Sequence, residues 1–264
     1  MNPITAATKD GHYARKQLFS RAGLITWSHR RRFKLAGCLV SRYQGRILLD
    51  FGCGDGTFLA KACDSAFRPV EAVGAEITES LVVDCRRRLA IIRDLTFVQV
   101  SDLRDTQWQE RFDVIVCMEV LEHVTDWEPI FELWDRLLAP GGELLVSVPN
   151  ETGVALMIKQ AARRIAGWCG VADYPGLARY TWREFWSGVF AGSSQHISRP
   201  IHRMPGAPPF HCHKGFNWRV LKNELVKRWD LVRMFRSPLA FLPMSLNSQI
   251  WFLLRRPRND AATS

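Results

Sequence analysis

The chain has 264 residues, of which 47% are hydrophobic and 23% are charged. These are ordinary values for a globular protein with one main core, and they exclude a mainly disordered or fibrous chain. The seven cysteines form no C-x-x-C pair, which argues against a disulfide framework or a zinc knuckle and favours a reducing cytoplasm. No uninterrupted apolar run reaches the roughly 18 residues that a membrane-spanning helix needs, so we expect none.

The net charge of +10 is distributed unevenly along the chain. Residues 1–46 carry +9, residues 47–150 carry −10 and residues 151–264 carry +11. The basic flanks, rather than the acidic middle, are therefore expected to meet an anionic partner: nucleic acid, a phospholipid surface or an acidic small molecule. The alternative is that these cations only face water.

From residue 46 onward, short apolar runs alternate with amphipathic stretches, which is typical of β-α units around a parallel sheet. Strands are predicted at residues 46–51, 70–77, 95–100, 111–118 and 143–148. Helices are expected to begin at Thr57 and after Thr78 as an N-cap, and to cover residues 127–138.

Beyond Pro149 this alternation ends, and a basic amphipathic helix is predicted over residues 153–168. Its apolar face would carry Val154, Ile158, Ala161, Ile165 and Trp168, and its cationic face Lys159, Arg163 and Arg164. Such a helix either packs into the core or lies on an anionic membrane surface.

A second helix is predicted to open with Thr181 and Glu184, which stand at the spacing of a capping box. It carries a stripe of Trp182, Phe185, Trp186, Val189 and Phe190. We interpret the stripe as a core face, with the wall of a pocket as the alternative. A long loop over residues 191–215, a helix over 215–229 and two strands at 230–237 and 247–256 complete the chain.

The stretch "LLDFGCGDG" places Asp50 at the end of the first strand, before Gly52, Gly54 and Gly56. It lacks the lysine of a P-loop, and Thr57 stands where a dinucleotide fingerprint has its third glycine. A carboxylate this close to a pyrophosphate would cost on the order of 4 kcal/mol in repulsion. The turn is therefore predicted to bind a cation-bearing ligand, and S-adenosylmethionine supplies an ammonium and a sulfonium on a nucleoside.

Two more carboxylates follow successive strands. Glu76 ends the second strand, where doubly wound folds place an acid on the ribose hydroxyls of a nucleotide. Asp102 follows the third strand, where its oxygen can accept from an adenine amino group. Because open α/β sheets bind ligands at the carboxyl ends of their strands, all three acids are expected at one site.

The stretches "LLDFGCGDG", "VGAEIT", "FDVIVCMEVLEHVTD" and "LLAPGGELLVSVPN" resemble successive motifs of the class I S-adenosylmethionine-dependent methyltransferases, over about residues 46–150. The resemblance implies an α/β fold, a doubly wound seven-stranded Rossmann-like sheet whose last strand is antiparallel, with an inserted cap of helix and loop. It also implies that the methionine part is held by Asp50, Gly52, Gly54 and Gly56, the ribose by Glu76 and the adenine by Asp102, with Met118 as the floor.

Within that class, "VCMEVLEHV" followed by "PGG" looks most like the branch that methylates ubiquinone precursors and related small hydroxylated acceptors. The branch implies a divalent metal such as Mg on Glu119, Glu122 and His123, which would converge on one helical face. Otherwise His123 deprotonates or orients the acceptor, and Glu119 and His123 are the predicted catalytic residues. The branch also places an arginine before the first strand, which we assign to Arg32.

A phenol or hydroxyl acceptor needs a base, and His211 and His213 in the long loop are further candidates beside His123. The same loop histidines, with His196 and His202, match no standard zinc spacing.

We expect a basic helical segment at 1–45, a cofactor-binding core at 46–150 and an acceptor-covering insert at 151–215. A helix and hairpin at 216–258 would complete the sheet, and 259–264 would be a disordered tail.

The sequence thus predicts a cytoplasmic methyltransferase for a small or lipid-linked acceptor, by O-methylation, with peripheral attachment to the inner face of the membrane as a further expectation. Two alternatives stay open. A tRNA or rRNA methyltransferase would explain the basic flanks, although no recognisable RNA-binding module is present. The second alternative is a non-catalytic scaffold that binds the cofactor.

Overall fold

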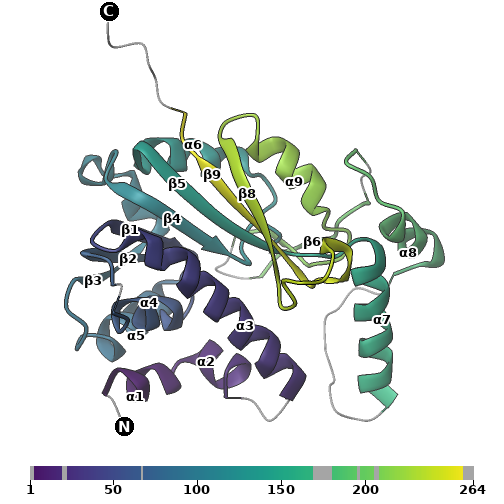
Figure 1. Ribbon diagram of the computed structural model, residues 1–264, viewed down its shortest axis with the longest axis horizontal. Helices are drawn as coiled ribbons and strands as arrows, with labels where there is room; N and C mark the ends of the chain where they lie inside the picture. Colours follow the sequence, from purple (N-terminus) through teal and green to yellow (C-terminus); the bar gives the residue numbers. More distant parts are fainter. Residues whose placement is uncertain are drawn as a thin grey trace, which may run out of the picture. The chain divides into compact units, whose positions relative to one another are not determined.

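The computed structural model describes residues 3–19, 23–66, 68–168, 180–194, 197–204 and 208–257. Within these ranges a seven-stranded mixed sheet of order β3-β2-β1-β4-β5-β9-β8 contains one antiparallel strand (Figure 1). Its strands are β1 (Ile47–Phe51), β2 (Glu71–Glu76), β3 (Leu95–Gln99), β4 (Phe112–Met118), β5 (Leu138–Pro149), β8 (Asp230–Ser237) and β9 (Gln249–Arg255). The predicted doubly wound fold is confirmed.

The chain forms two compact units. The first comprises Met1–Met118, Glu128–Val146 and Leu253–Ser264, and the second comprises Glu119–Trp127 and Ser147–Phe252. Strands β5 and β9 contribute residues to both units. Each unit is described separately below.

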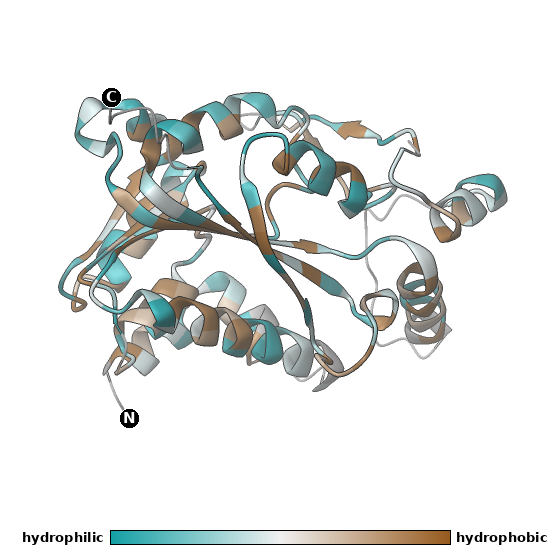
Figure 2. Ribbon diagram, turned by 45° about the horizontal axis from the view of Figure 1, so that its top comes forward, coloured by the Kyte–Doolittle hydropathy of each residue, from teal (hydrophilic) through white to brown (hydrophobic). Residues whose placement is uncertain are grey.

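In the first unit, β1 lies between β2 and β4 and runs parallel to both. Leu48 and Leu49 are completely buried, and Figure 2 shows the hydrophobic colour of these central strands. The helices of this unit are α1 (Pro3–Lys9), α2 (His12–Gln17), α3 (Gly23–Val40), α4 (Thr57–Cys63), α5 (Glu79–Arg88) and α6 (Glu128–Leu137). Strand periodicity predicted β1 to β4 to within about one residue at each end, because buried parallel strands are short and continuously apolar.

Two details of the first unit differ from expectation. Thr78 is the N-cap residue of α5, but its side chain accepts no capping hydrogen bond. Strand β5 begins at Leu138, directly after α6, so it is longer than the predicted run from Glu143. The prediction missed this extension because "APGG" looks like a helix terminator followed by a turn.

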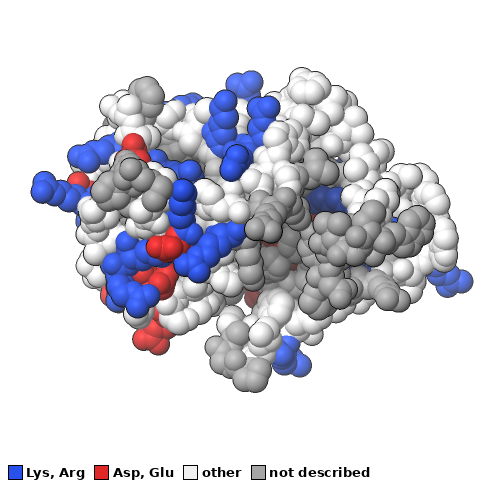
Figure 3. Space-filling model, turned by 90° about the horizontal axis from the view of Figure 1, so that it is seen from below, with Lys and Arg blue, Asp and Glu red and all other residues white. Residues whose placement is uncertain are grey.

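Part of the basic charge of the first unit is neutralised by ion pairs within it. Arg15 pairs with Asp10 at 3.3 Å, and Arg87 pairs with Asp84 at 3.0 Å. Figure 3 accordingly shows acidic groups interspersed with Lys and Arg on the face seen from below. Exposed ion pairs of this kind contribute little to stability. Their main effect is to reduce the positive charge that the surface presents to ligands.

The second unit contains α7 (Gly153–Trp168), α8 (Trp182–Val189) and α9 (Trp218–Leu225). The predicted capping box of α8 is confirmed, because Thr181 N donates to Glu184 at 2.7 Å and Glu184 N donates to Thr181 at 3.3 Å. The predicted loop 191–215 includes a two-stranded antiparallel sheet of β6 (Ile201–His202) and β7 (Phe210–His211). None of the described helices combines the length and apolar character needed to cross a bilayer.

The prediction that the aromatic stripe of α8 is a core face is wrong. Trp182 is 73% exposed and Phe190 is 76% exposed. The buried position on this helix is Gly188, where a Cβ would come within 2.7 Å of Leu156 in α7. The glycine face therefore packs on α7, and the aromatic rings stack on one another instead, with Trp186 and Phe190 centroids 5.8 Å apart.

The apolar face predicted for α7 is also not a core face, and its membrane alternative stays a prediction. Ile158 is 51% exposed, whereas Ala155 and Leu156 are buried. Lys159 and Arg163, which were predicted on the cationic face, turn toward the buried carboxylate of Glu151. Val154 and Ile165 are likewise exposed, and the side chain of Trp168 lies outside the described residues. A buried acid reorients the helix, which helical periodicity alone does not reveal.

Candidate active site

The turn after β1 has the backbone of a ligand cradle. Gly52, Gly54 and Gly56 all have positive φ, at 78°, 56° and 70°. Gly56 begins α4, and a Cβ there would lie 2.7 Å from Leu89 and 2.8 Å from Phe97. Any side chain at this position would be strained by its φ and by its neighbours, so the glycine is required by both backbone and packing.

Asp50 stands at the end of β1, only 1% exposed, and neither of its carboxylate oxygens has a hydrogen-bond partner among the described residues. Burial raises its pKa to about 8, and the nearby charges of Glu76 and Asp55 add to the shift. A buried acid without a partner is costly unless a cation arrives to pair with it. The Asp50 carboxylate therefore needs a positively charged ligand group as its partner.

Glu76 ends β2, and its carboxylate is fixed by three backbone donors. Gly54 N donates to Oε2 at 3.0 Å, while Ile77 N and Thr78 N donate to Oε1 at 2.9 and 3.2 Å. An ionised carboxylate has about four acceptor positions, so one remains for a ligand hydroxyl. The acid is thus held rigidly beside the glycine turn.

A cavity of about 430 Å³ opens in the first unit. Phe51, Ile77 and Leu133 give it apolar walls, and Gln99 and Ser101 add polar groups. Its mainly apolar lining with a few convergent polar groups suits a flat aromatic base. Ile77, which lines the cavity, directly follows Glu76 in the chain, so the cavity lies beside the end of β2.

The remaining predicted cofactor residues differ in how clearly they are placed. Asp102 Oδ2 accepts from Gln99 N at 3.1 Å, so this acid caps the turn after β3 and borders the cavity through Gln99. Met118 is the last residue of β4. Arg32 is buried on α3 with its guanidinium 5.5 Å from the ring centre of Phe33. Roles in cofactor binding stay predictions for all three.

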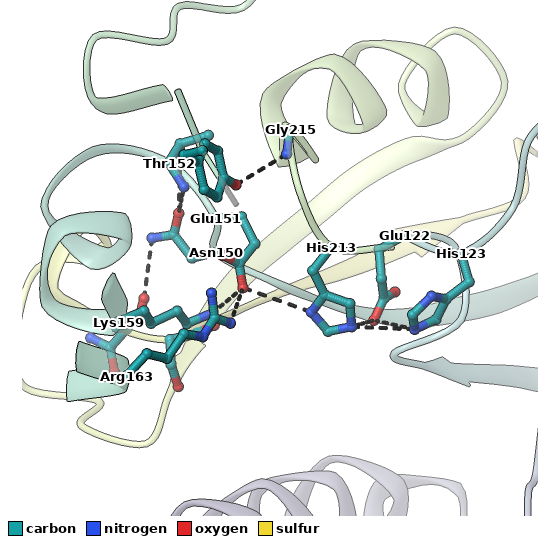
Figure 4. Close-up of polar contacts among 12 residues, drawn as sticks. Glu122, His123, Asn150, Glu151, Thr152, Lys159, Arg163, His213 and Gly215 are labelled. Atoms are coloured by element: carbon teal, nitrogen blue, oxygen red, sulfur yellow. Dashed lines mark hydrogen bonds and ion pairs between the residues drawn. The ribbon is translucent and has the colours of Figure 1, made fainter. Parts of the chain in front are cut away.

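The second unit contains a cluster of Glu122, His123 and His213, whose ligand atoms lie within 4.8 Å of one another (Figure 4). His123 Nε2 and His213 Nε2 are 3.2 Å apart. Glu122 Oε1 lies 3.9 Å from the first of these nitrogens and 4.0 Å from the second. Glu122 is completely buried, so its carboxylate and the two rings form a compact polar centre.

Glu151 extends this cluster from the other side of His213, as Figure 4 shows. Its Oε1 lies 3.7 Å from His213 Nδ1, 2.8 Å from Lys159 Nζ and 3.8 Å from Arg163. Burial alone would raise the pKa of Glu151, but Lys159, His213 and Arg163 lower it to about 2. The sequence patterns did not predict Glu151, although its position two residues after the end of β5 was a usable signal.

The hydrogen bonds of His123 fix its tautomer. Its Nδ1 lies 2.8 Å from the carbonyl oxygen of His211, and a carbonyl only accepts, so Nδ1 carries the proton. Nε2 then presents a lone pair to the cluster. Burial lowers the pKa of His123, with the neighbouring His213 and Arg199 acting in the same direction. A neutral imidazole at pH 7 can accept a proton or ligate a metal.

The expected convergence of Glu119 with Glu122 and His123 on a helix is wrong, because residues 119–123 form a turn. Glu119 has a φ of 58°, and its N–H donates to Ser147 O at 2.9 Å. Its carboxylate accepts from Ser147 Oγ at 3.5 Å. The structure instead brings His213 to Glu122 and His123. Nothing local to "EVLEH" predicts this, because the third residue comes from 90 positions further along the chain.

The other loop histidines are not part of this cluster. His211 Nδ1 lies 3.0 Å from Pro200 O, and the ring of His202 stacks on Phe210. These contacts stabilise the β6-β7 hairpin. His196 lies outside the described residues.

A sheet of this order, with a buried unpaired acid at the end of β1, a glycine turn after it and a second acid at the end of β2, defines a Rossmann-like nucleoside-binding class of α/β protein. A family model described as "Methyltransferase domain" matches residues 26–200, and the chain belongs to this family.

Among similar curated proteins is a ubiquinone biosynthesis O-methyltransferase from Idiomarina loihiensis, 33% identical over 128 residues. The match covers 47% of this chain and 51% of that protein, so the chain spans about half the length of the relative.

Similar solved structures include an S-adenosylmethionine-dependent methyltransferase of Listeria monocytogenes described as putative, with a TM-score of 0.56 and 10% identity over 87% of this chain and 100% of that chain. Another is the N-methyltransferase NodS of Bradyrhizobium japonicum bound to S-adenosylhomocysteine, with a TM-score of 0.51 and 14% identity over 98% of this chain and 100% of that chain. At these identities the likeness concerns the fold.

Proposed function

We propose that this chain transfers the methyl group of S-adenosylmethionine to a hydroxyl of a small-molecule acceptor. The observation that carries the proposal is Asp50, a buried carboxylate whose oxygens have no hydrogen-bond partner among the described residues. Its raised pKa means that the empty site favours the protonated acid. A ligand that brings a cation over the glycine turn restores the charged form, which phosphate ligands do not.

The geometry of the first unit fits the rest of the cofactor. Asp50 would pair with the ammonium of the methionine part, and Glu76 would accept from a ribose hydroxyl with its remaining lone pair. The cavity between Ile77 and Leu133 would take the adenine. The sulfonium supplies the methyl group for an in-line displacement, so the protein mainly positions the reactants and excludes water.

On the acceptor side, we assign the base to His123. Its Nε2 faces the cluster at 3.2 Å from His213 Nε2, and the lowered pKa of His123 keeps its ring neutral near pH 7. A phenolic or alcoholic hydroxyl gains nucleophilicity when a base takes its proton during methyl transfer. Similarity to ubiquinone biosynthesis O-methyltransferases supports an oxygen acceptor, and a lipid-linked phenol is the narrower proposal. Residues 151–215, which contribute Glu151 and His213, would form the acceptor cap.

The decisive experiment is a methyl-transfer assay with S-adenosylmethionine labelled in the methyl group. The purified chain is incubated with cell extract, which is then fractionated into lipid, RNA, protein and small molecules. Label in the lipid or small-molecule fraction supports the proposal. Label confined to RNA would replace it with the tRNA or rRNA alternative. Binding of the cofactor without transfer to any fraction would favour the scaffold.

A divalent metal at the histidine cluster is the second part of the proposal. Two imidazoles and one carboxylate, from His123, His213 and Glu122, suit a zinc-type ion better than the magnesium expected from sequence. Bound there, the metal would polarise an acceptor hydroxyl and lower its pKa. Equilibrium dialysis should then show about one zinc per chain, and His213→Asn should abolish this binding while His202→Asn retains it. Sub-stoichiometric zinc on the wild-type chain would leave His123 as the base.

The third part concerns an anionic membrane surface. Trp182 of α8 and Phe190 at its C-cap are mostly exposed. Arg183 of α8 and Arg164 of α7 are exposed cations. Aromatic rings beside cations are typical of segments that insert at the lipid headgroup level. Vesicles containing phosphatidylglycerol should therefore float the protein in a salt-sensitive manner. The pair Trp182→Ser and Phe190→Ser should weaken flotation at least tenfold, whereas Phe241→Ser, outside α7 and α8, should not; equal flotation of all variants would contradict this contact.

A further inference from the structure

The histidine cluster of the second unit is assembled from two backbone segments that lie far apart in the sequence. Glu122 and His123 belong to the turn after β4, and His213 belongs to the loop after β7. Figure 4 shows the three side chains meeting between these segments. The 3.2 Å approach of the two Nε2 atoms therefore depends on what holds the segments at a fixed separation.

One link between the two segments is a reciprocal pair of hydrogen bonds. His211 N donates to His123 O at 2.8 Å, and His123 Nδ1 donates to His211 O at 2.8 Å. This pair orients the ring of His123. The carbonyl oxygens of Glu122 and Cys212, one residue away in each segment, take no part in it, and buried carbonyl oxygens need a donor of their own.

Arg199 supplies a donor to both of these carbonyl oxygens. Its Nη2 donates to Glu122 O and, at 3.3 Å, to Cys212 O. The guanidinium carbon lies 5.3 Å from the ring centre of Phe216, which is almost completely buried. The planar guanidinium is thus held against a fixed surface, and one nitrogen bridges the turn and the loop.

The charge of Arg199 also lies beside the cluster. Burial lowers the pKa of Arg199 to about 10, while the charges of Cys212 and Glu122 act in the opposite direction. The guanidinium is therefore a cation at pH 7, and it stands near the completely buried carboxylate of Glu122. Because Arg199 donates to the backbone oxygen of Glu122, Oε1 of this acid still faces the imidazoles, 3.9 and 4.0 Å from their Nε2 atoms.

From these contacts we infer that Arg199 is a positioning residue for the base. By joining the turn to the loop, it holds the ring of His123 against that of His213, and so fixes where the base meets the acceptor hydroxyl. The effect on the reaction rests on the proposed function, whereas the effect on the ring geometry does not. Arg199 acts through the backbone, since Nη2 donates to carbonyl oxygens and Nε is buried.

The geometric part is tested by NMR on the full-length chain with isotope-labelled histidine. Wild type should show a nuclear Overhauser effect between the rings of His123 and His213, whose centres are 4.8 Å apart. Arg199→Met keeps an apolar stem but removes the donors and the charge, so this signal should lose most of its intensity. The contact of His202 with Phe210, at 5.5 Å, should persist and report an intact hairpin.

The functional part is tested by the initial rate of methyl transfer to the fraction that accepts the label. Arg199→Met should lower this rate about tenfold to 100-fold, because misplacing a reacting group by about 1 Å can cost about 100-fold. Arg199→Lys should retain most of the rate, since both hydrogen bonds come from one nitrogen and an ammonium also has several donors. Affinity for S-adenosylhomocysteine should stay at the wild-type value in both variants.

Arg203→Met is the matched control, because Arg203 is an exposed arginine of the same segment. It should match wild type in both the ring contact and the rate. A purely structural role for Arg199 would lower the melting temperature of Arg199→Met and leave the rate per folded molecule unchanged.

The outcomes separate Arg199 from the proposed function. If folded Arg199→Met keeps both the wild-type ring contact and the wild-type rate, the inference is overturned and the proposed function stands. Should Arg199→Met not fold, Arg199→Gln replaces it, because its shorter side chain does not reach both carbonyl oxygens, and the same result there overturns the inference. If the wild-type chain transfers no label, the proposed function fails, and the ring contact alone decides the role of Arg199.

Discussion

Asp50→Asn should weaken binding of S-adenosylmethionine by at least about 100-fold. The change removes the negative charge that would pair with the ligand ammonium, and breaking a buried charge pair costs about 3 kcal/mol or more. Calorimetry with S-adenosylhomocysteine provides the measurement, since both compounds share the ammonium. Asp105→Asn is a suitable control, because its exposed side chain makes no capping hydrogen bond. Unchanged affinity in Asp50→Asn would remove the observation on which the proposed function rests.

The same variant should remove the pH dependence of stability that Asp50 causes. The pKa of Asp50 is about 8 in the folded chain, above that of an unfolded aspartate. Its contribution to the free energy of unfolding is therefore fully present below the unfolded pKa of about 4, and is lost as pH rises toward 8. Asparagine does not titrate and loses no stability over this pH range. Ligand-free Asp50→Asn should therefore have a higher melting temperature than wild type at pH 8 and a similar melting temperature at pH 4.

The affinity for the ligand should instead increase with pH, because the cation of the ligand binds the ionised form of Asp50. Wild-type affinity should rise roughly tenfold for each pH unit from 6 to 8 and level off above the pKa of Asp50. Calorimetry in buffers of different ionisation enthalpy should show release of about one proton per ligand at pH 7. In Asp50→Asn both effects should disappear.

His123→Gln should lower kcat by about 100-fold to 10,000-fold once an acceptor is in hand, which is the range of a general base. Cofactor affinity should stay at the wild-type value, because the proposed cofactor contacts come from other residues. Radiolabel transfer gives the rate and calorimetry gives the affinity. His202→Gln is the control, since its ring stacks on Phe210 outside the cluster. A wild-type rate in His123→Gln would assign the base elsewhere.

The sequence predicted the cofactor half of the molecule well because its signals are local. Strand β1, the positive-φ glycines and the acid at the end of β2 lie within 30 residues, at spacings set by one β-α-β unit. Periodicity gave α7 its observed bounds, Gly153–Trp168. Each of these features depends on neighbours in the chain, so local patterns suffice.

The histidine cluster could not be predicted in the same way. His213 reaches His123 across 90 residues, and the turn at Glu119 depends on a backbone bond to Ser147. Helical periodicity did not predict that the cationic face of α7 packs on the protein, where Glu151, a buried acid before the helix, pairs with Lys159 and Arg163. Asp55 lies inside the glycine turn, yet its oxygens accept from backbone N–H groups of α2 and α4. Long-range electrostatic pairing decided each of these cases.

The stacked rings of α8 also give the chain an optical reporter. Trp182 and Trp186 are exposed, whereas Trp134, Trp229 and Trp251 are almost completely buried. Iodide in solution should therefore quench the long-wavelength part of the indole emission first. Any binding event that covers α8 would shield that component and move the spectrum to the blue, with no label attached to the protein.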